Sequence, residues 1–150
     1  MRNHLMKIIA TIARIIMGCV FVFFGLNMFF QFLHMPPPPS GPAGDFVKAL
    51  FVSHYLYVVA ALQVVGGLLC LTGRFVPLGL TLLGPVIVNI LLFHILLNRT
   101  GLSMAIFVSV LALIVLWHHR SSFAGLVKSG VDKLAADDPK RLELQPVNQK

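Results

Sequence analysis

Polar side chains lie inside the most apolar parts of this chain. The run Pro85–Asn98, PVIVNILLFHILLN, is almost entirely Ile, Leu, Val and Phe, yet it contains Asn89 and His94. An amide and an imidazole can both form hydrogen bonds to a small molecule, for example to a carbonyl oxygen. Because burying such groups without a partner costs several kcal/mol, each of them is a candidate functional residue.

The spacing of these residues predicts which of them share a helix face. Gln31 and His34 lie four and seven residues after Asn27, so at ~100° per residue all three share one face of a helix. Asn89 and His94 are five residues apart, which separates them by about 140° on an ideal helix. We therefore expect Asn89 and His94 to reach different neighbours.

The residue types exclude several kinds of chemistry. The apolar runs contain no Asp or Glu, which argues against a carboxylate proton relay or a di-iron carboxylate site. No histidine pair within these runs has the spacing of metal ligands on a helix, and Ser53-His54 is a dipeptide without an acid to complete a triad. We therefore predict no catalytic residue, no metal site and no haem.

Two interpretations of the polar residues remain open. They could hydrogen-bond between helices without binding any ligand, or they could line a site for a lipid-soluble molecule with a polar head, such as a quinone. A metal or haem site built from His34, His54 and His94 is a third and less favoured interpretation. The candidate ligand-binding residues are Asn27, Gln31, His34, Gln63, Asn89 and His94.

The elements that carry these residues are four apolar runs. The chain is 57% hydrophobic and 11% charged, whereas a water-soluble domain has about 25% charged residues. A helix that crosses a bilayer needs about 20 apolar residues, and the runs lack the alternation of a strand. We predict an all-α, four-helix transmembrane bundle in residues 1–120, followed by a cytoplasmic tail, 121–150, with a short amphipathic helix. The predicted spans are residues 8–33, 54–72, 75–97 and 102–117.

The distribution of basic residues predicts the orientation. Lys and Arg gather in the N-terminal flank, the link at Arg74 and the C-terminal flank, while the opposite side carries only Lys48, beside Asp45, and Arg99. The positive-inside rule then places both termini in the cytoplasm, and we predict a multi-pass protein of the bacterial inner membrane. Because the net charge of +7 comes largely from these flanks, nucleic-acid binding is not expected. The lipid bilayer is the predicted partner.

This orientation brings the polar residues to a common depth. Asn89, His94 and the polar residues at the end of the first span fall in the outer half of the membrane, and Gln63 lies near its middle. The sequence therefore predicts a polar cavity that opens toward the outer face. Arg14 lies near the inner end of the first span and is predicted to contact lipid phosphate.

Two stretches resemble a known family. The run Gln63–Leu97, QVVGGLLCLTGRFVPLGLTLLGPVIVNILLFHILL, and the stretch Ala13–Phe32, ARIIMGCVFVFFGLNMFFQF, are similar to the DoxX/DoxD-like family of small four-helix membrane proteins. The family takes its name from a subunit of an archaeal thiosulfate:quinone oxidoreductase. Its members have an acid at the position of Gln63, so any proton handling by that acid would be absent here.

The resemblance implies a membrane subunit close to quinone- or thiol-linked redox chemistry. We therefore predict an accessory subunit of a membrane redox complex, not catalytic on its own, with a quinone-sized pocket and a soluble or membrane oxidoreductase as its partner. The alternatives are a small-molecule carrier and a structural interaction protein without a ligand. A homo-oligomer is left open.

Overall fold

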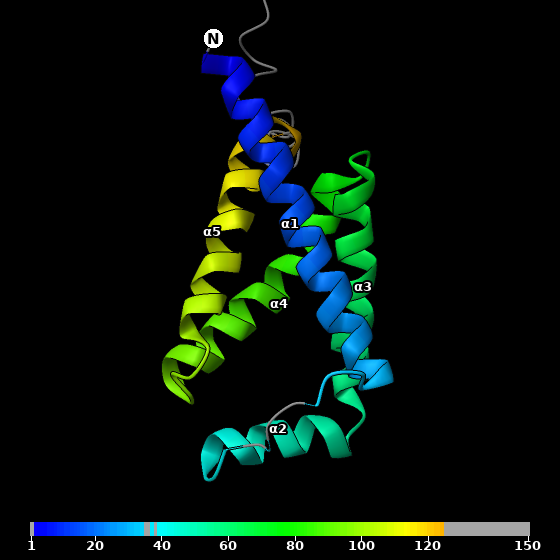
Figure 1. The fold of residues 1–150 in the computed structure, drawn as a ribbon, viewed down its shortest axis with the longest axis vertical. Coiled ribbons are helices and arrows are strands. Elements are labelled where there is room, and N and C mark those ends of the chain that lie inside the picture. The colour runs from blue at the N-terminus through cyan, green and yellow to red at the C-terminus, as the bar shows by residue number, and fades with distance from the viewer. Residues whose placement is uncertain (1, 35–36, 38, 125–150) are drawn as a thin grey trace, which may run out of the picture. The chain divides into compact units, whose positions relative to one another are not determined.

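All regular secondary structure is helical in the part of the chain that the computed structural model describes, residues 2–34, 37 and 39–124. This confirms the predicted all-α class. The elements up to His118 are α1 (Arg2–Phe30), α2 (Pro42–Val52), α3 (Tyr55–Thr72), α4 (Val76–Leu96) and α5 (Leu102–His118) (Figure 1).

The long helices have the length and composition of membrane spans. Residues 4–30 of α1, the whole of α3 and the whole of α4 are long and apolar enough to cross a bilayer, and α5 is an apolar helix of 17 residues. Large apolar side chains point outward, with Val58 55% exposed and Leu113 62% exposed. Such a surface is unfavourable in water and suits lipid, so the fold is a helical membrane bundle, as predicted.

The four long helices form a ring. α1 packs on α3 and on α5, and α4 packs on the same two helices. The short helix α2 contacts α3 and lies across the end of the bundle where α1 ends and α3 begins (Figure 1). The link between α4 and α5 lies at this same end, because helices α3, α4 and α5 alternate in direction.

Glycines allow close contact between the helix backbones. A Cβ atom built on Gly67 of α3 would lie 2.9 Å from the carbonyl oxygen of Gly18 on α1 and 3.1 Å from the backbone nitrogen of Val22. On the other side of α3, a Cβ on Gly79 of α4 would lie 2.8 Å from the Gly66 carbonyl oxygen. Small residues thus hold α3 tightly between α1 and α4, which is typical of membrane helix packing.

The first helix ends earlier than the predicted span 8–33. Gln31 adopts a left-handed backbone conformation with φ 49°, and its N–H donates to the Asn27 carbonyl oxygen at 2.8 Å. The Asn27 side-chain oxygen then accepts the N–H of Leu33 at 2.7 Å. These bonds satisfy backbone groups at the helix end, so α1 stops at Phe30.

The other long helices lie close to the predicted spans. The spans predicted at 54–72, 75–97 and 102–117 correspond closely to α3, α4 and α5. The described residues after His118, 119–124, belong to a separate unit. The predicted amphipathic helix of the tail lies almost entirely outside the described residues.

Candidate functional site

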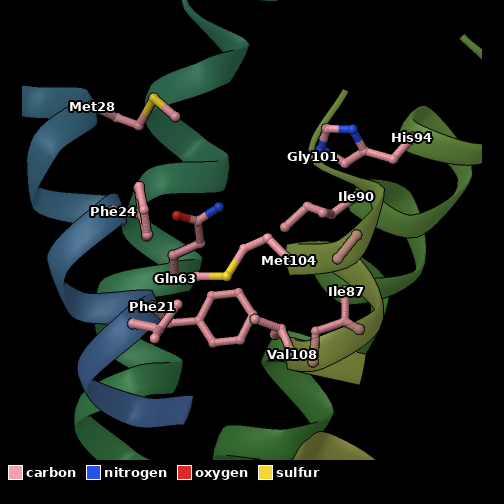
Figure 2. Close-up of a pocket in the computed structure, with 12 residues that line it drawn as sticks. Phe21, Phe24, Met28, Gln63, Ile87, Ile90, His94, Gly101, Met104 and Val108 are labelled. Carbon is pink, nitrogen blue, oxygen red and sulfur yellow. The ribbon is translucent and has the colours of Figure 1, made fainter. Parts of the chain in front are cut away.

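A pocket of about 350 Å³ lies between the four long helices. This volume falls within the range of about 300–1,000 Å³ that is usual for small-molecule sites. Most of the wall is apolar, and the two large polar side chains in it are Gln63 and His94. Figure 2 shows the aromatic and aliphatic part of the wall around them, which includes Phe21, Phe24, Met28, Ile87, Ile90, Met104 and Val108.

Gln63 brings a buried amide into the pocket. It lies one helical turn before Gly67, and a Cβ on Gly25 of α1 would be 3.1 Å from the Gln63 Cβ. The residue is 7% exposed, and its Oε1 atom is buried without a hydrogen-bond partner in the described part of the chain. Figure 2 shows the carboxamide projecting from α3 into the space between α1 and α5, with Met104 facing it.

His94 provides the second polar group, near the end of α4. Its Nδ1 lies 2.9 Å from the backbone oxygen of Asn98. Because a carbonyl oxygen can only accept, Nδ1 carries a hydrogen, so Nε2 is an acceptor in the neutral form of the ring. Gly101 has φ 89°, and a Cβ there would lie 2.9 Å from the His94 Cε1 atom, so this glycine leaves room for the imidazole beside the turn into α5 (Figure 2).

Most of the pocket lies in a part of the chain that matches a known family. Residues 9–95 match the model described as DoxX, which is more than half of the chain. The chain belongs to the DoxX family. The comparisons with curated proteins and with solved structures each gave no significant match. The DoxX match runs from α1 through almost all of α4 and includes both Gln63 and His94, whereas the part of the wall contributed by α5 lies beyond it.

The structure brings only two of the six candidate ligand residues of this DoxX-family chain into the pocket. Asn27 is buried, but its side-chain oxygen is bonded to Leu33, and it does not line the pocket. Gln31 and His34 are exposed beyond the end of α1. Asn89 is also exposed and lines a different, smaller hollow with Phe46 of α2. A ligand-binding role for these four residues stays a prediction.

Sequence reasoning considered only polar residues and therefore missed the apolar wall. The aromatic stretch that includes Phe21 and Phe24 gave a signal, because it is unusually rich in Phe. No sequence signal indicated that Gly101 and Met104 would line the pocket, because their position depends on how α5 packs against α1 and α4.

Arg14 has protein partners in the structure. Its Nη1 donates to the backbone oxygens of Cys70 at 2.7 Å and Leu71 at 3.3 Å. These carbonyls belong to the last turn of α3, where carbonyl oxygens lose their usual helical partners and where a positive charge is favourable. The Cys70 oxygen also accepts the N–H of Gly73 at 3.3 Å. The predicted contact with lipid phosphate stays a prediction, but the observed bonds give Arg14 a structural role at the end of α3.

Replacing Gln63 with leucine is expected to stabilise the DoxX-family fold. The change removes a buried oxygen without a partner, which costs about 1–3 kcal/mol, and keeps a side chain of similar size. We expect the free energy of unfolding in detergent to rise by about 1 kcal/mol, measured by reversible denaturation.

Asn27→Leu is the matched control, because Asn27 is a buried amide whose oxygen is bonded. This variant should lower the free energy of unfolding by about 1 kcal/mol. If Gln63→Leu lowered it equally, the Gln63 amide would have a partner in the folded protein.

Proposed function

We propose that this DoxX-family membrane protein holds a small lipid-soluble molecule of the quinone class in the pocket between its long helices. The observation that carries the proposal is the placement of one buried amide, Gln63, and one imidazole, His94, in an otherwise apolar wall. Apolar walls with a few placed polar groups are typical of small-molecule sites.

The hydrogen-bonding groups suit both redox forms of a quinone. The Gln63 carboxamide can donate to a ring carbonyl or accept from a ring hydroxyl, because it carries both kinds of group. The His94 Nε2 atom can accept from a hydroxyl, since Nδ1 is engaged with Asn98. The aromatic and aliphatic side chains of α1, α4 and α5 would surround the ring and the start of its tail.

We further propose that the chain is an accessory subunit of a membrane redox complex, with both termini on the cytoplasmic side of the bacterial inner membrane. The clustering of Lys and Arg in the terminal flanks and near Arg74 supports this orientation. In it, His94 and the link to α5 lie toward the outer face.

Titration with short-chain ubiquinone and menaquinone analogues tests the ligand. We expect saturable binding to the purified protein in nanodiscs, measured by calorimetry. Gln63→Leu and His94→Leu should each weaken binding by about threefold to tenfold, since a hydrogen bond contributes about 0.5–1.5 kcal/mol.

Asn89→Leu is the control, because Asn89 lies on α4 like His94 but does not line this pocket. Its affinity should equal that of the unchanged protein. The proposal would be contradicted if all three variants bound with the affinity of the unchanged protein. It would also be contradicted if the unchanged protein showed no saturable binding.

Purification of the tagged chain from native membranes in mild detergent tests the accessory role. A quinone-dependent oxidoreductase activity with a thiol or thiosulfate donor should co-elute with the chain. Elution of the chain without such activity would speak against the complex while leaving the ligand site intact.

A further inference from the structure

One face of α4 is turned away from the other long helices. Asn89 lies in the middle of this face and is exposed. Its neighbours recur every three or four residues, as expected for one side of a helix, and are exposed as well. We call this surface the lipid face of α4; besides Asn89 it consists of Leu78, Thr81, Pro85, Val88, Leu92 and Leu96.

Asn89 is too deep to reach water from this face. Helix α4 runs from Val76 to Leu96, so Asn89 lies about 4.5 Å past its midpoint and about 10 Å from its end. Its side chain is short, unlike the lysine and arginine side chains that extend to the membrane surface. Thr81, the other polar residue of the lipid face, donates its hydroxyl hydrogen to the Pro77 carbonyl oxygen at 2.9 Å, whereas no such bond is seen for the Asn89 side chain in the described part of the chain.

We propose that the lipid face of α4 is a contact surface between two copies of this chain, paired through Asn89. Two copies with the same orientation in one bilayer place their Asn89 residues at the same depth. A carboxamide carries both a donor and an acceptor, so two of them can bond to each other across a two-fold axis. Amide hydrogen bonds of this kind join helices in membranes.

The surroundings of Asn89 fit a second copy. A hollow of about 230 Å³ lies beside it, lined by Phe46 of α2 and by residues near the end of α4 that include Leu92 and Leu96. The ring centroids of Phe46 and Phe93 lie 5.8 Å apart, and the Phe46 ring forms one side of this hollow. An apolar side chain from the lipid face of the second copy can enter it, so the Asn89 pair would be enclosed by apolar contacts.

Disulfide crosslinking in proteoliposomes tests this interface. In a background of Cys19→Ser and Cys70→Ala, Leu92→Cys places a single thiol on the lipid face while Asn89 is retained. We expect oxidation to give a covalent dimer. Leu68→Cys on α3 is the matched control, because Leu68 and Leu92 are both 48% exposed, and it should crosslink at least tenfold more slowly.

Second-site variants test the role of the amide itself. Asn89→Leu should slow the Leu92→Cys crosslink by at least tenfold, and Asn89→Gln should preserve most of it. Asn89→Leu places an apolar residue on a lipid-facing surface, so the helix content by circular dichroism should be unchanged. Equal crosslinking at positions 68 and 92, or crosslinking at 92 that does not depend on Asn89, would overturn the proposal.

Discussion

Replacing Gly67 with alanine should lower the free energy of unfolding by about 1–3 kcal/mol. The added Cβ would lie 2.9 Å from the Gly18 carbonyl oxygen and 3.1 Å from the Val22 backbone nitrogen. Both are backbone atoms, so no side chain can rotate away and α1 must move from α3. Because Gln63 lies one turn from this contact, the pocket should widen as well. Reversible denaturation in detergent gives the free energy of unfolding.

Gly84→Ala is the matched control for this substitution. Gly84 also lies within a membrane helix, but a Cβ built on it would meet nothing within 4 Å. Alanine there should leave stability unchanged or raise it by up to ~1 kcal/mol, because alanine loses less backbone freedom on folding than glycine. Equal destabilisation at both positions would mean that the cost at Gly67 does not come from contact with α1.

Replacing Arg14 with methionine should lower the free energy of unfolding by about 1.5–3 kcal/mol, since hydrogen bonds to charged groups contribute about this much. The Cys70 and Leu71 carbonyl oxygens would lose their charged donor at the end of α3. Methionine keeps much of the apolar length of the side chain, so the change isolates the guanidinium. Thermal and chemical denaturation should agree on the loss.

A double-mutant cycle with Gly73 tests whether Arg14 acts at this site. Gly73 has φ 74°, and a Cβ there would lie 2.5 Å from the Arg14 Nη1 atom. Gly73→Ala should therefore displace Arg14 and also cost about 1–2 kcal/mol for its left-handed backbone. In the Arg14→Met background only the backbone cost should remain. Strictly additive losses would show that the two residues do not interact.

The helices could be predicted from the sequence because their ends carry strong local signals. Gly73 and the Thr100-Gly101 pair separate long apolar runs, and the observed ends of α3, α4 and α5 lie within about one residue of the predicted ones. The end of α1 was placed too late, because the apolar run continues through Phe32 and Leu33. The turn made by the Asn27 side chain and the Gln31 backbone ends the helix before these residues.

The candidate site could be predicted only in part, because a shared face requires a continuous helix. The rule of ~100° per residue does not extend from Asn27 to Gln31 and His34 once α1 has ended. For α4, the predicted separation of about 140° between Asn89 and His94 left open which of them faces the other helices. Packing decided it, since His94 lines the pocket and Asn89 is exposed.

Long-range contacts were the least predictable feature. The partners of Arg14 are more than 50 residues away along the chain, and no local pattern pairs them. The sequence suggested that Arg14 would extend to the membrane surface, because it lies near one end of a predicted span. Its position beside Gly73 depends on the close packing of α1 against α3, which several glycines determine together.

The length of α5 has a consequence for the surrounding lipid. Its 17 residues rise about 25 Å, whereas a typical hydrocarbon core is about 30 Å thick. The bilayer next to α5 must therefore thin, or the helix must draw polar residues inward, and either adjustment has an energetic cost. A bilayer of lipids with shorter acyl chains would remove this hydrophobic mismatch. The energetic cost of inserting this side of the protein therefore depends on the thickness of the host membrane.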